Sequence, residues 1–253
     1  MRVSLIQSSL VWEDVPANLS AFEQQIAALA NTDLIVLPEM FSTGFTMQPN
    51  RVAEPMNGPT VNWMKAMAAR SGAALCGSVV IEEDGKYFNR CLFVCPTGEI
   101  VHYDKKHLFT LAGEDKAFTA GTHKLIIEYK GFRICPLICY DLRFPVFSRN
   151  MEDYDLLIYV ANWPEPRVLA WDTLLKARAI ENMSYVAGVN RVGMDGNGHR
   201  YVGHSQFFDM LGHPMGESSE EEAAITVELD KKALLEARQK FGFLNDRDSF
   251  KVI

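Results

Sequence analysis

Residues 134–145 read Ile-Cys-Pro-Leu-Ile-Cys-Tyr-Asp-Leu-Arg-Phe-Pro. The first five predict a buried apolar strand, and the polar residues after them predict a turn into a helix. Cys139 stands at that junction. A strand that stops at a turn displays its last side chain at the rim of a sheet, and a following helix directs backbone N–H groups to the same place. The position is one where nucleophiles are displayed, whereas a buried core residue is the more common outcome for any single cysteine.

Two other predicted strands also lead to charged side chains. Residues 34–37 are a hydrophobic run that ends at Pro-Glu, which places Glu39 after the strand. Residues 100–103 run into a polar segment that contains Lys105. In α/β sheets the carboxyl ends of strands gather in one crevice, so residues far apart in the sequence become neighbours. We therefore expect an acid, a cation and a thiol to meet at one site.

The length and composition of the chain indicate one globular domain over residues 1–253. A chain of 253 residues with 48% hydrophobic content buries roughly three quarters of its unfolded surface. It contains no apolar run of eighteen residues, so we expect no membrane span. The tail, about residues 240–253, keeps several aromatic residues. We expect it to pack either on the domain or on a partner subunit.

Charge and cysteine content exclude several classes of function. The net charge of −7 and the pI near 5.4 argue against a nucleic-acid partner, which calls for a basic face. Five cysteines, an odd number, do not form a disulfide framework, and this favours a cytoplasmic location. Cysteine pairs four residues apart lie in predicted strands, where such residues merely share a face, so we expect no zinc site. We expect no other metal and no cofactor.

Helical and extended patterns alternate through the chain. A helix of about fourteen residues is expected to begin near Asp14 and Pro16, and others are predicted over 59–71, 168–182 and 231–239. Further strands are predicted over 33–37, 73–81, 87–94, 156–160, 184–189, 201–209 and 223–228. This alternation predicts an α/β fold.

The three charged or nucleophilic residues suggest acyl transfer. A free thiol has a pKa near about 8.5, so Cys139 requires a base or a positive field beside it. Glu39 is suited to accept the thiol proton. Lys105 is suited to stabilise the tetrahedral oxyanion together with the backbone N–H of Tyr140. The alternative for Glu39 and Lys105 is a buried ion pair without a chemical role, which is costly to desolvate.

Three segments resemble a known family. Residues 37–39, 103–109 and 138–145 are similar to motifs of the nitrilase superfamily of carbon–nitrogen hydrolases, whose catalytic residues are Glu, Lys and Cys in that chain order. The resemblance implies a four-layer αββα sandwich that dimerises into a larger stack, as a homodimer or a higher homo-oligomer. It also implies a covalent thioester on the cysteine and a small-molecule amide as substrate.

The family pattern also assigns two further positions. Its Tyr-x-Lys-x-His-Leu motif selects Lys105 rather than Lys106. Residues 113–121 resemble the segment that holds a second active-site glutamate, which implies that Glu114 positions the substrate amide and the lysine. Outside this resemblance, Glu114 is simply a solvated loop charge.

Within the superfamily, residues 38–45, 161–164 and 178–182 look most like those of bacterial omega-amidases. That resemblance implies hydrolysis of 2-oxoglutaramate and 2-oxosuccinamate to the 2-oxo diacid and ammonia. The alternatives are an N-carbamoyl amine hydrolase, an aliphatic amidase or a nitrilase with the same catalytic residues. A rival from another class is a non-catalytic binding protein that keeps the fold.

A substrate of this kind carries a carboxylate away from the scissile amide. Arg143, four residues after the cysteine, is a candidate to bind it, and an ion pair with Asp141 is the alternative. Trp163 and Phe41 are candidate apolar walls of the substrate pocket, although a tryptophan at such a turn also serves as core.

Overall fold

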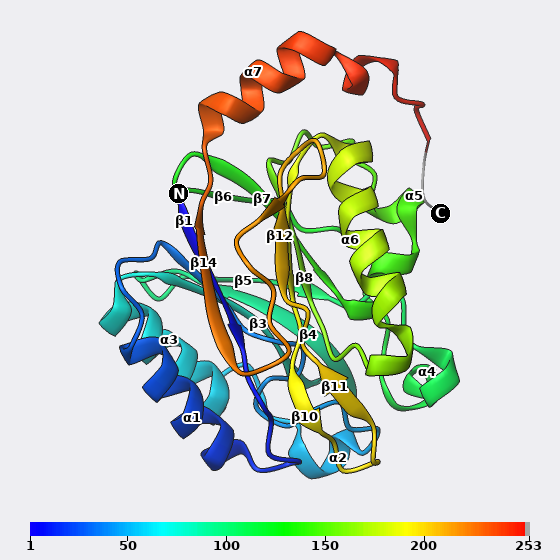
Figure 1. Ribbon diagram of the computed structural model, residues 1–253. Helices are drawn as coiled ribbons and strands as arrows, with labels where there is room; N and C mark the ends of the chain where they lie inside the picture. The colour runs from blue at the N-terminus through cyan, green and yellow to red at the C-terminus, as the bar shows by residue number, and fades with distance from the viewer. Residues whose placement is uncertain (251–253) are drawn as a thin grey trace.

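The first sheet is built around three parallel strands, and the computed structural model describes residues 1–250 of the chain (Figure 1). The strand order is β14-β1-β2-β3-β4-β5, in which β1, β2 and β3 are parallel and the outer strands are antiparallel. The strands are β1 (Arg2–Gln7), β2 (Leu34–Val36), β3 (Ala74–Glu83), β4 (Lys86–Val94), β5 (Ile100–Asp104) and β14 (Ala223–Glu228).

The second sheet has the same plan, with parallel strands β7, β8 and β9 at its centre and the order β13-β12-β9-β8-β7-β6. Its strands are β6 (Ile127–Tyr129), β7 (Phe132–Ile138), β8 (Leu156–Val160), β9 (Tyr185–Val189), β12 (Gln206–Phe208) and β13 (Pro214–Met215). Strands β10 (Val192–Met194) and β11 (Arg200–Val202) form a separate hairpin. Apart from Arg133 of β7, the central strands are buried, as continuous apolar runs require.

Helices lie outside the two sheets. Figure 1 shows α1 and α3 beside the first sheet and α6 beside the second. The α-helices are α1 (Val15–Ala27), α2 (Pro49–Val52), α3 (Pro59–Ser71), α4 (Glu114–Ala117), α5 (Pro145–Ser148), α6 (Val168–Asn182) and α7 (Lys231–Phe241). The 3₁₀ helices are Thr110–Ala112, Cys139–Arg143, Glu165–Arg167 and Phe243–Asp246. Within residues 1–250, no helix is both long and apolar enough to cross a membrane.

The hydrophobic core has two main parts. One joins residues such as Val36 and Phe93 of the first sheet to Ile158 of the second, and continues to Trp171 and Leu175 of α6. The other joins the first sheet to α1 and α3, through residues such as Phe22. The chain therefore has an α/β fold with two mixed six-stranded sheets and flanking helices. The sheets hold the ends of β2, β5, β7 and β8 in fixed positions.

The predicted helices and most predicted strands are confirmed, and two predictions are wrong in detail. The strand predicted over 201–209 is divided between β11 and β12, because Gly203 and His204 adopt left-handed φ angles of 72° and 58°. A side chain at Gly203 would also collide with Gln7. The helix predicted after Cys139 is a short 3₁₀ helix that ends before Phe144, and a second turn, α5, follows it.

The C-terminal arm comprises α7 and the residues after it. Lys231 and Arg238 anchor α7 through ion pairs with the buried carboxylate of Asp155. The aromatic side chains of Phe241 and Phe243 are exposed on this chain. Figure 1 shows the arm arching over the top of the molecule and returning beside α5, where Arg247 pairs with Asp153. The last three residues of the predicted tail, 251–253, lie outside the described residues.

Candidate active site

Cys139 stands at a sharp turn immediately after β7. Its φ angle is +42°, in the left-handed region that side chains other than glycine rarely occupy. Such a conformation costs on the order of 1–3 kcal/mol and persists only where the surroundings hold it. The residue is 9% exposed, and its Sγ lies 3.8 Å from the carbonyl oxygen of Asn162, which accepts from the thiol. The turn therefore presents the sulfur at the end of the strand, as the sequence predicts.

Asp141 holds this turn in place. Its buried carboxylate accepts hydrogen bonds from the backbone N–H of Ile138 at 2.9 Å and from the hydroxyl of Tyr103 at 2.7 Å. Its other oxygen lies 2.7 Å from Nδ1 of His107. The ion pair considered between Asp141 and Arg143 is wrong, because these partners already occupy the carboxylate. Arg143 is left free to face the cavity.

The side chains of Glu39, Lys105 and Glu114 form one fully buried cluster. The Lys105 ammonium donates to Oε1 of Glu39 at 2.8 Å and to both carboxylate oxygens of Glu114, at 3.0 and 2.9 Å. All three side chains have no exposed surface. Glu114 is thus a buried partner of Lys105, and the reading as a solvated loop charge is wrong. A single lysine thus faces two carboxyl groups.

Two asparagines that the sequence did not single out complete the cluster. Nδ2 of Asn89, on β4, donates to Glu39 at 2.8 Å and to Glu114 at 3.2 Å. Asn162, after β8, donates from its backbone N–H to Glu39 Oε2 at 3.0 Å and from Nδ2 to the Glu39 carbonyl at 2.6 Å. The one available signal was a lone polar residue, Asn89, on a strand face shared with Cys91 and Phe93.

The pKa shifts follow from burial and from these contacts. Burial raises the pKa of the Cys139 thiol well above its usual range, and the Glu39 charge raises it further, whereas Lys105 lowers it. Burial alone would lower the pKa of Lys105, but the charges of Glu114 and Glu39 outweigh burial and the pKa is raised. Burial also raises the pKa of Glu114, against the opposing effect of Lys105. At neutral pH the resting site therefore holds a neutral thiol beside a charged lysine.

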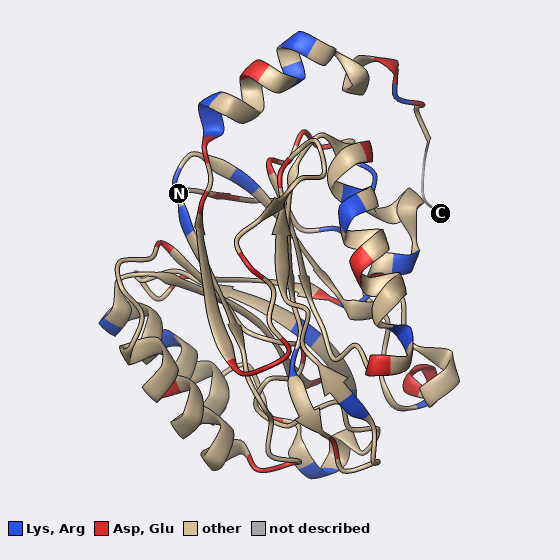
Figure 2. Cartoon of the chain, in the orientation of Figure 1, with Lys and Arg blue, Asp and Glu red and all other residues tan. Residues whose placement is uncertain are grey.

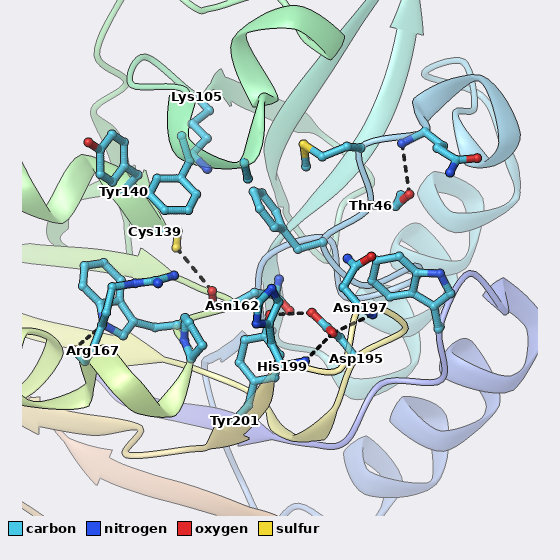
Figure 3. Close-up of a pocket in the computed structure, with 18 of the residues that line it drawn as sticks. Thr46, Lys105, Cys139, Tyr140, Asn162, Arg167, Asp195, Asn197, His199 and Tyr201 are labelled. Carbon is cyan, nitrogen blue, oxygen red and sulfur yellow. Dashed lines mark hydrogen bonds between the residues drawn. The ribbon is translucent and has the colours of Figure 1, made fainter.

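A cavity of about 410 Å³ opens onto the thiol (Figure 3). This volume lies in the range typical of small-molecule sites. Cys139 and Lys105 lie on its wall, and so do the predicted binding residues Tyr140, Arg143 and Trp163. The β10–β11 hairpin contributes a further wall: Asp195, Asn197, His199 and Tyr201. The cavity thus gathers residues from both sheets and from the hairpin.

The prediction that Phe41 forms a pocket wall is wrong. Phe41 is fully buried and packs in the core against Phe22 and Trp63. It lies over β3 at Gly77, where an added Cβ would come within 3.0 Å of the Phe41 ring. Phe45 lines the cavity instead, with its ring centre 5.2 Å from the Lys105 ammonium.

Two arginines lie at the cavity with their guanidinium groups stacked on aromatic rings. Arg143 lies 4.9 Å from the ring centre of Trp163, and Arg167 lies 5.2 Å from that of Phe109. Trp163 is also held by a hydrogen bond from its Nε1 to the carbonyl of Arg167, at 2.7 Å. Sequence reasoning named Arg143 and Trp163 but missed Arg167, which no motif marked.

Comparison with known proteins agrees with this geometry. The family model described as Carbon-nitrogen hydrolase matches residues 2–239. The chain is 47% identical over 253 residues to the omega-amidase YafV of Escherichia coli K12. This match covers all of the chain and 98% of the relative. It is 32% identical to the 2-oxoglutaramate amidase of Bacillus subtilis, over 85% of each protein.

A solved structure shares the whole fold. XC1258 from Xanthomonas campestris, described as a CN-hydrolase superfamily protein with an arsenic adduct in its active site, superimposes with a TM-score of 0.97. The two sequences are 45% identical, and the match covers all of this chain and 98% of the other. The matched family model and these full-length relatives show that this chain belongs to the carbon-nitrogen hydrolase family, the nitrilase superfamily.

Proposed function

We propose that this protein is an omega-amidase that hydrolyses the side-chain amide of small 2-oxo acid amides, such as 2-oxoglutaramate, to the 2-oxo diacid and ammonia. The observation that carries the proposal is the Cys139 thiol beside the buried cluster of Glu39, Lys105 and Glu114. The full-length similarity to omega-amidase YafV supports the substrate class. The similarity to a 2-oxoglutaramate amidase supports it further.

In the first step of the proposed mechanism, the Cys139 sulfur attacks the amide carbon while Glu39 accepts the thiol proton. The carbonyl oxygen becomes an oxyanion next to Lys105 and the backbone N–H of Tyr140. This N–H lies in the first turn of a 3₁₀ helix, where backbone N–H groups have no acceptor within the helix. One donor of this type is worth about 2.7 to 4 kcal/mol of transition-state stabilisation.

Lys105 has a specific task in this step, because its three N–H groups already serve two carboxylates. Glu114 accepts two of them. The substrate oxyanion replaces one of these two bonds, so Lys105 gains a partner without leaving Glu39. Glu114 keeps the other bond and the backbone N–H of Phe109, which lies 2.6 Å from Oε2.

Collapse of the tetrahedral intermediate breaks the C–N bond, and the proton on Glu39 moves to the departing nitrogen, which leaves as ammonia. The thioester on Cys139 is then attacked by water, whose proton Glu39 accepts. The second tetrahedral intermediate releases the carboxylic acid, and the proton returns to the thiolate. Positioned proton transfer of this kind contributes about 10² to 10⁴ in rate.

Ammonia release from three classes of substrate tests the proposed function. We expect rapid release from 2-oxoglutaramate, and at least about tenfold lower kcat/KM with an N-carbamoyl amine and with an aliphatic nitrile, because these place different groups in the cavity. Hydrolysis of the carbamoyl compound alone would overturn the omega-amidase proposal and leave the thiol mechanism standing. An absence of turnover with all three, together with an intact thiol, would favour a binding protein.

We propose further that the chain is a single domain that pairs with a second copy through its C-terminal arm, which would stack two sandwiches. The arm exposes Leu235, Phe241 and Phe243, and exposed apolar groups of this kind are typical of an interface. We expect light scattering at micromolar concentration to give twice the chain mass of 28.5 kDa. Phe243→Asp should weaken the pairing, and a monomeric mass for the wild type would contradict the proposed dimer.

The expected location of the protein is the cytoplasm.

A further inference from the structure

The cavity contains two arginines whose charge is not balanced locally. Among residues 1–250, neither Arg143 nor Arg167 forms an ion pair with a carboxylate. Glu165, two residues before Arg167, pairs with the exposed Arg200 at 2.8 Å. Figure 2 shows acidic residues on many elements of the chain, and the net charge is −7. Two uncompensated cations in one cavity of an acidic protein therefore indicate an anionic ligand.

The other charged groups in the cavity are already committed. Lys105 is bound by Glu39 and Glu114. Asp195, the carboxylate in the cavity wall, accepts the hydroxyl of Tyr201 at 2.9 Å and the backbone N–H groups of Asn197 and His199. It folds the hairpin turn and forms no ion pair with Arg143 or Arg167. The guanidinium groups remain available to a ligand.

Aromatic rings position both guanidinium groups in the cavity. Each lies over an aromatic ring, Arg143 over Trp163 and Arg167 over Phe109. A guanidinium held over an aromatic ring keeps N–H groups that can form a bidentate pair with a carboxylate. The hydrogen bond from Trp163 Nε1 to the Arg167 carbonyl links the ring that lies under Arg143 to the backbone of Arg167. The pair is therefore arranged before the ligand arrives.

The chemistry of a 2-oxo acid calls for two such groups. It carries three oxygens close together, two on the carboxylate and one on the neighbouring carbonyl. One guanidinium satisfies the carboxylate, and the second reaches a carboxylate oxygen and the 2-oxo oxygen. Cys139 and both arginines line the same cavity, so a short molecule with an amide at one end and a 2-oxo acid at the other spans them.

We propose that Arg167 is a specificity-determining residue that, together with Arg143, binds the 2-oxo acid end of the substrate, an inference that rests on the proposed function. Arg167 sets the preference of the enzyme for amides that bear a carboxylate over uncharged amides of the same length. It takes no part in proton transfer or in attack by the thiol.

Kinetics of Arg167→Gln and Arg167→Lys test this role, with Arg200→Gln as the matched control because Arg200 is exposed and bound to Glu165. The substrates are 2-oxoglutaramate, glutaramate, which lacks the 2-oxo group, and uncharged pentanamide. We expect Arg167→Gln to lower kcat/KM for 2-oxoglutaramate about 10- to 100-fold, mainly through KM, the range for loss of a charge-assisted pair. The value of kcat/KM should fall less for glutaramate, and it should change less than threefold for pentanamide.

For 2-oxoglutaramate, the kcat/KM of Arg167→Lys should lie between those of the wild type and Arg167→Gln. The lysine ammonium keeps the positive charge but lacks the two parallel N–H groups of a guanidinium. Arg200→Gln should leave all three substrates unchanged. Equal losses on charged and uncharged amides, or no loss on either, would overturn the proposal. If the wild type does not hydrolyse 2-oxoglutaramate, the proposed function fails. The ratio of kcat/KM for glutaramate to kcat/KM for pentanamide in the variants still decides the role of Arg167.

A second readout does not depend on turnover. The product 2-oxoglutarate should protect Cys139 from alkylation by iodoacetamide, because it occupies the same cavity. We expect Arg167→Gln to raise the half-protecting concentration of 2-oxoglutarate at least about tenfold, and Arg200→Gln to leave it unchanged. Equal protection of the wild type and of Arg167→Gln would overturn the proposal.

Discussion

Replacing Cys139 by alanine is expected to lower kcat for 2-oxoglutaramate by at least about 10⁴-fold, because no other group in the site forms the covalent acyl intermediate. Cys139→Ser is expected to lose at least about 10³-fold, since a hydroxyl has a far higher pKa than a thiol and Glu39 must then remove a harder proton. Ammonia release under saturating substrate measures both effects.

The matched control is Cys135→Ala. Cys135 lies four residues earlier on β7 and is fully buried in the hydrophobic core. Cys135 is not among the residues that line the cavity, so the substrate does not reach its thiol. We expect Cys135→Ala to keep kcat within about threefold while losing some stability to a small cavity. Substantial activity in Cys139→Ala, with a native circular dichroism spectrum, would refute the thiol mechanism.

Glu39→Gln is expected to lower kcat about 10²- to 10⁴-fold, the usual contribution of a positioned base. The amide keeps the size of the carboxylate and can still accept from Lys105 and Asn89, so the fold should persist. The same change should have the opposite effect on alkylation. Burial and the Glu39 charge both raise the pKa of the Cys139 thiol, and Lys105 lowers it, so removal of the Glu39 charge should leave the pKa raised by burial but lower than in the wild type.

The pH profile of alkylation by iodoacetamide measures this directly. In the wild type the thiol pKa lies well above its usual range, so the rate should still be rising above about pH 9, where a free cysteine approaches its plateau. In Glu39→Gln the profile should move to lower pH and the rate at pH 7 should increase. Glu165→Gln, an exposed carboxylate, serves as control. An unshifted profile in Glu39→Gln would contradict the proposed contact between base and thiol.

The sequence was sufficient for the parts of the site that follow strands directly. Lys105 and Cys139 come immediately after β5 and β7, and Glu39 comes three residues after β2. A hydrophobic run that ends at a polar residue is a local signal, and the geometry of parallel sheets brings such ends together. The bounds of α6 were predictable for a similar reason, because its pattern is local.

Phe41 was predicted at the cavity, where Phe45 lies instead, because the chain turns at Met40, immediately before Phe41. Met40 has a φ angle of +43°, and the backbone N–H of Phe41 donates to the carbonyl of Ser78 at 3.2 Å. These contacts turn Phe41 back toward Gly77 and the core. A left-handed residue other than glycine leaves no mark in the sequence, so the direction of the side chains after it was not predictable.

Asn162 and Arg167 were missed for a different reason. Asn162 meets Glu39 across 123 positions of sequence and from the opposite sheet. Such a contact depends on the register of two sheets that pack face to face, which periodicity along one strand does not encode. Arg167 follows a Pro-Glu-Pro segment that reads as an ordinary turn, and only the stack on Phe109 places it at the cavity.

Mass spectrometry of the intact protein mixed with a slowly hydrolysed amide of a 2-oxo acid, followed by peptide mapping, tests the central claim most directly. The account predicts one acyl group per chain, bound as a thioester that hydroxylamine removes, and located on Cys139. It also predicts no adduct in Cys139→Ala. An acyl group on Cys135 or on Lys105, or full turnover without any adduct under single-turnover conditions, would contradict it.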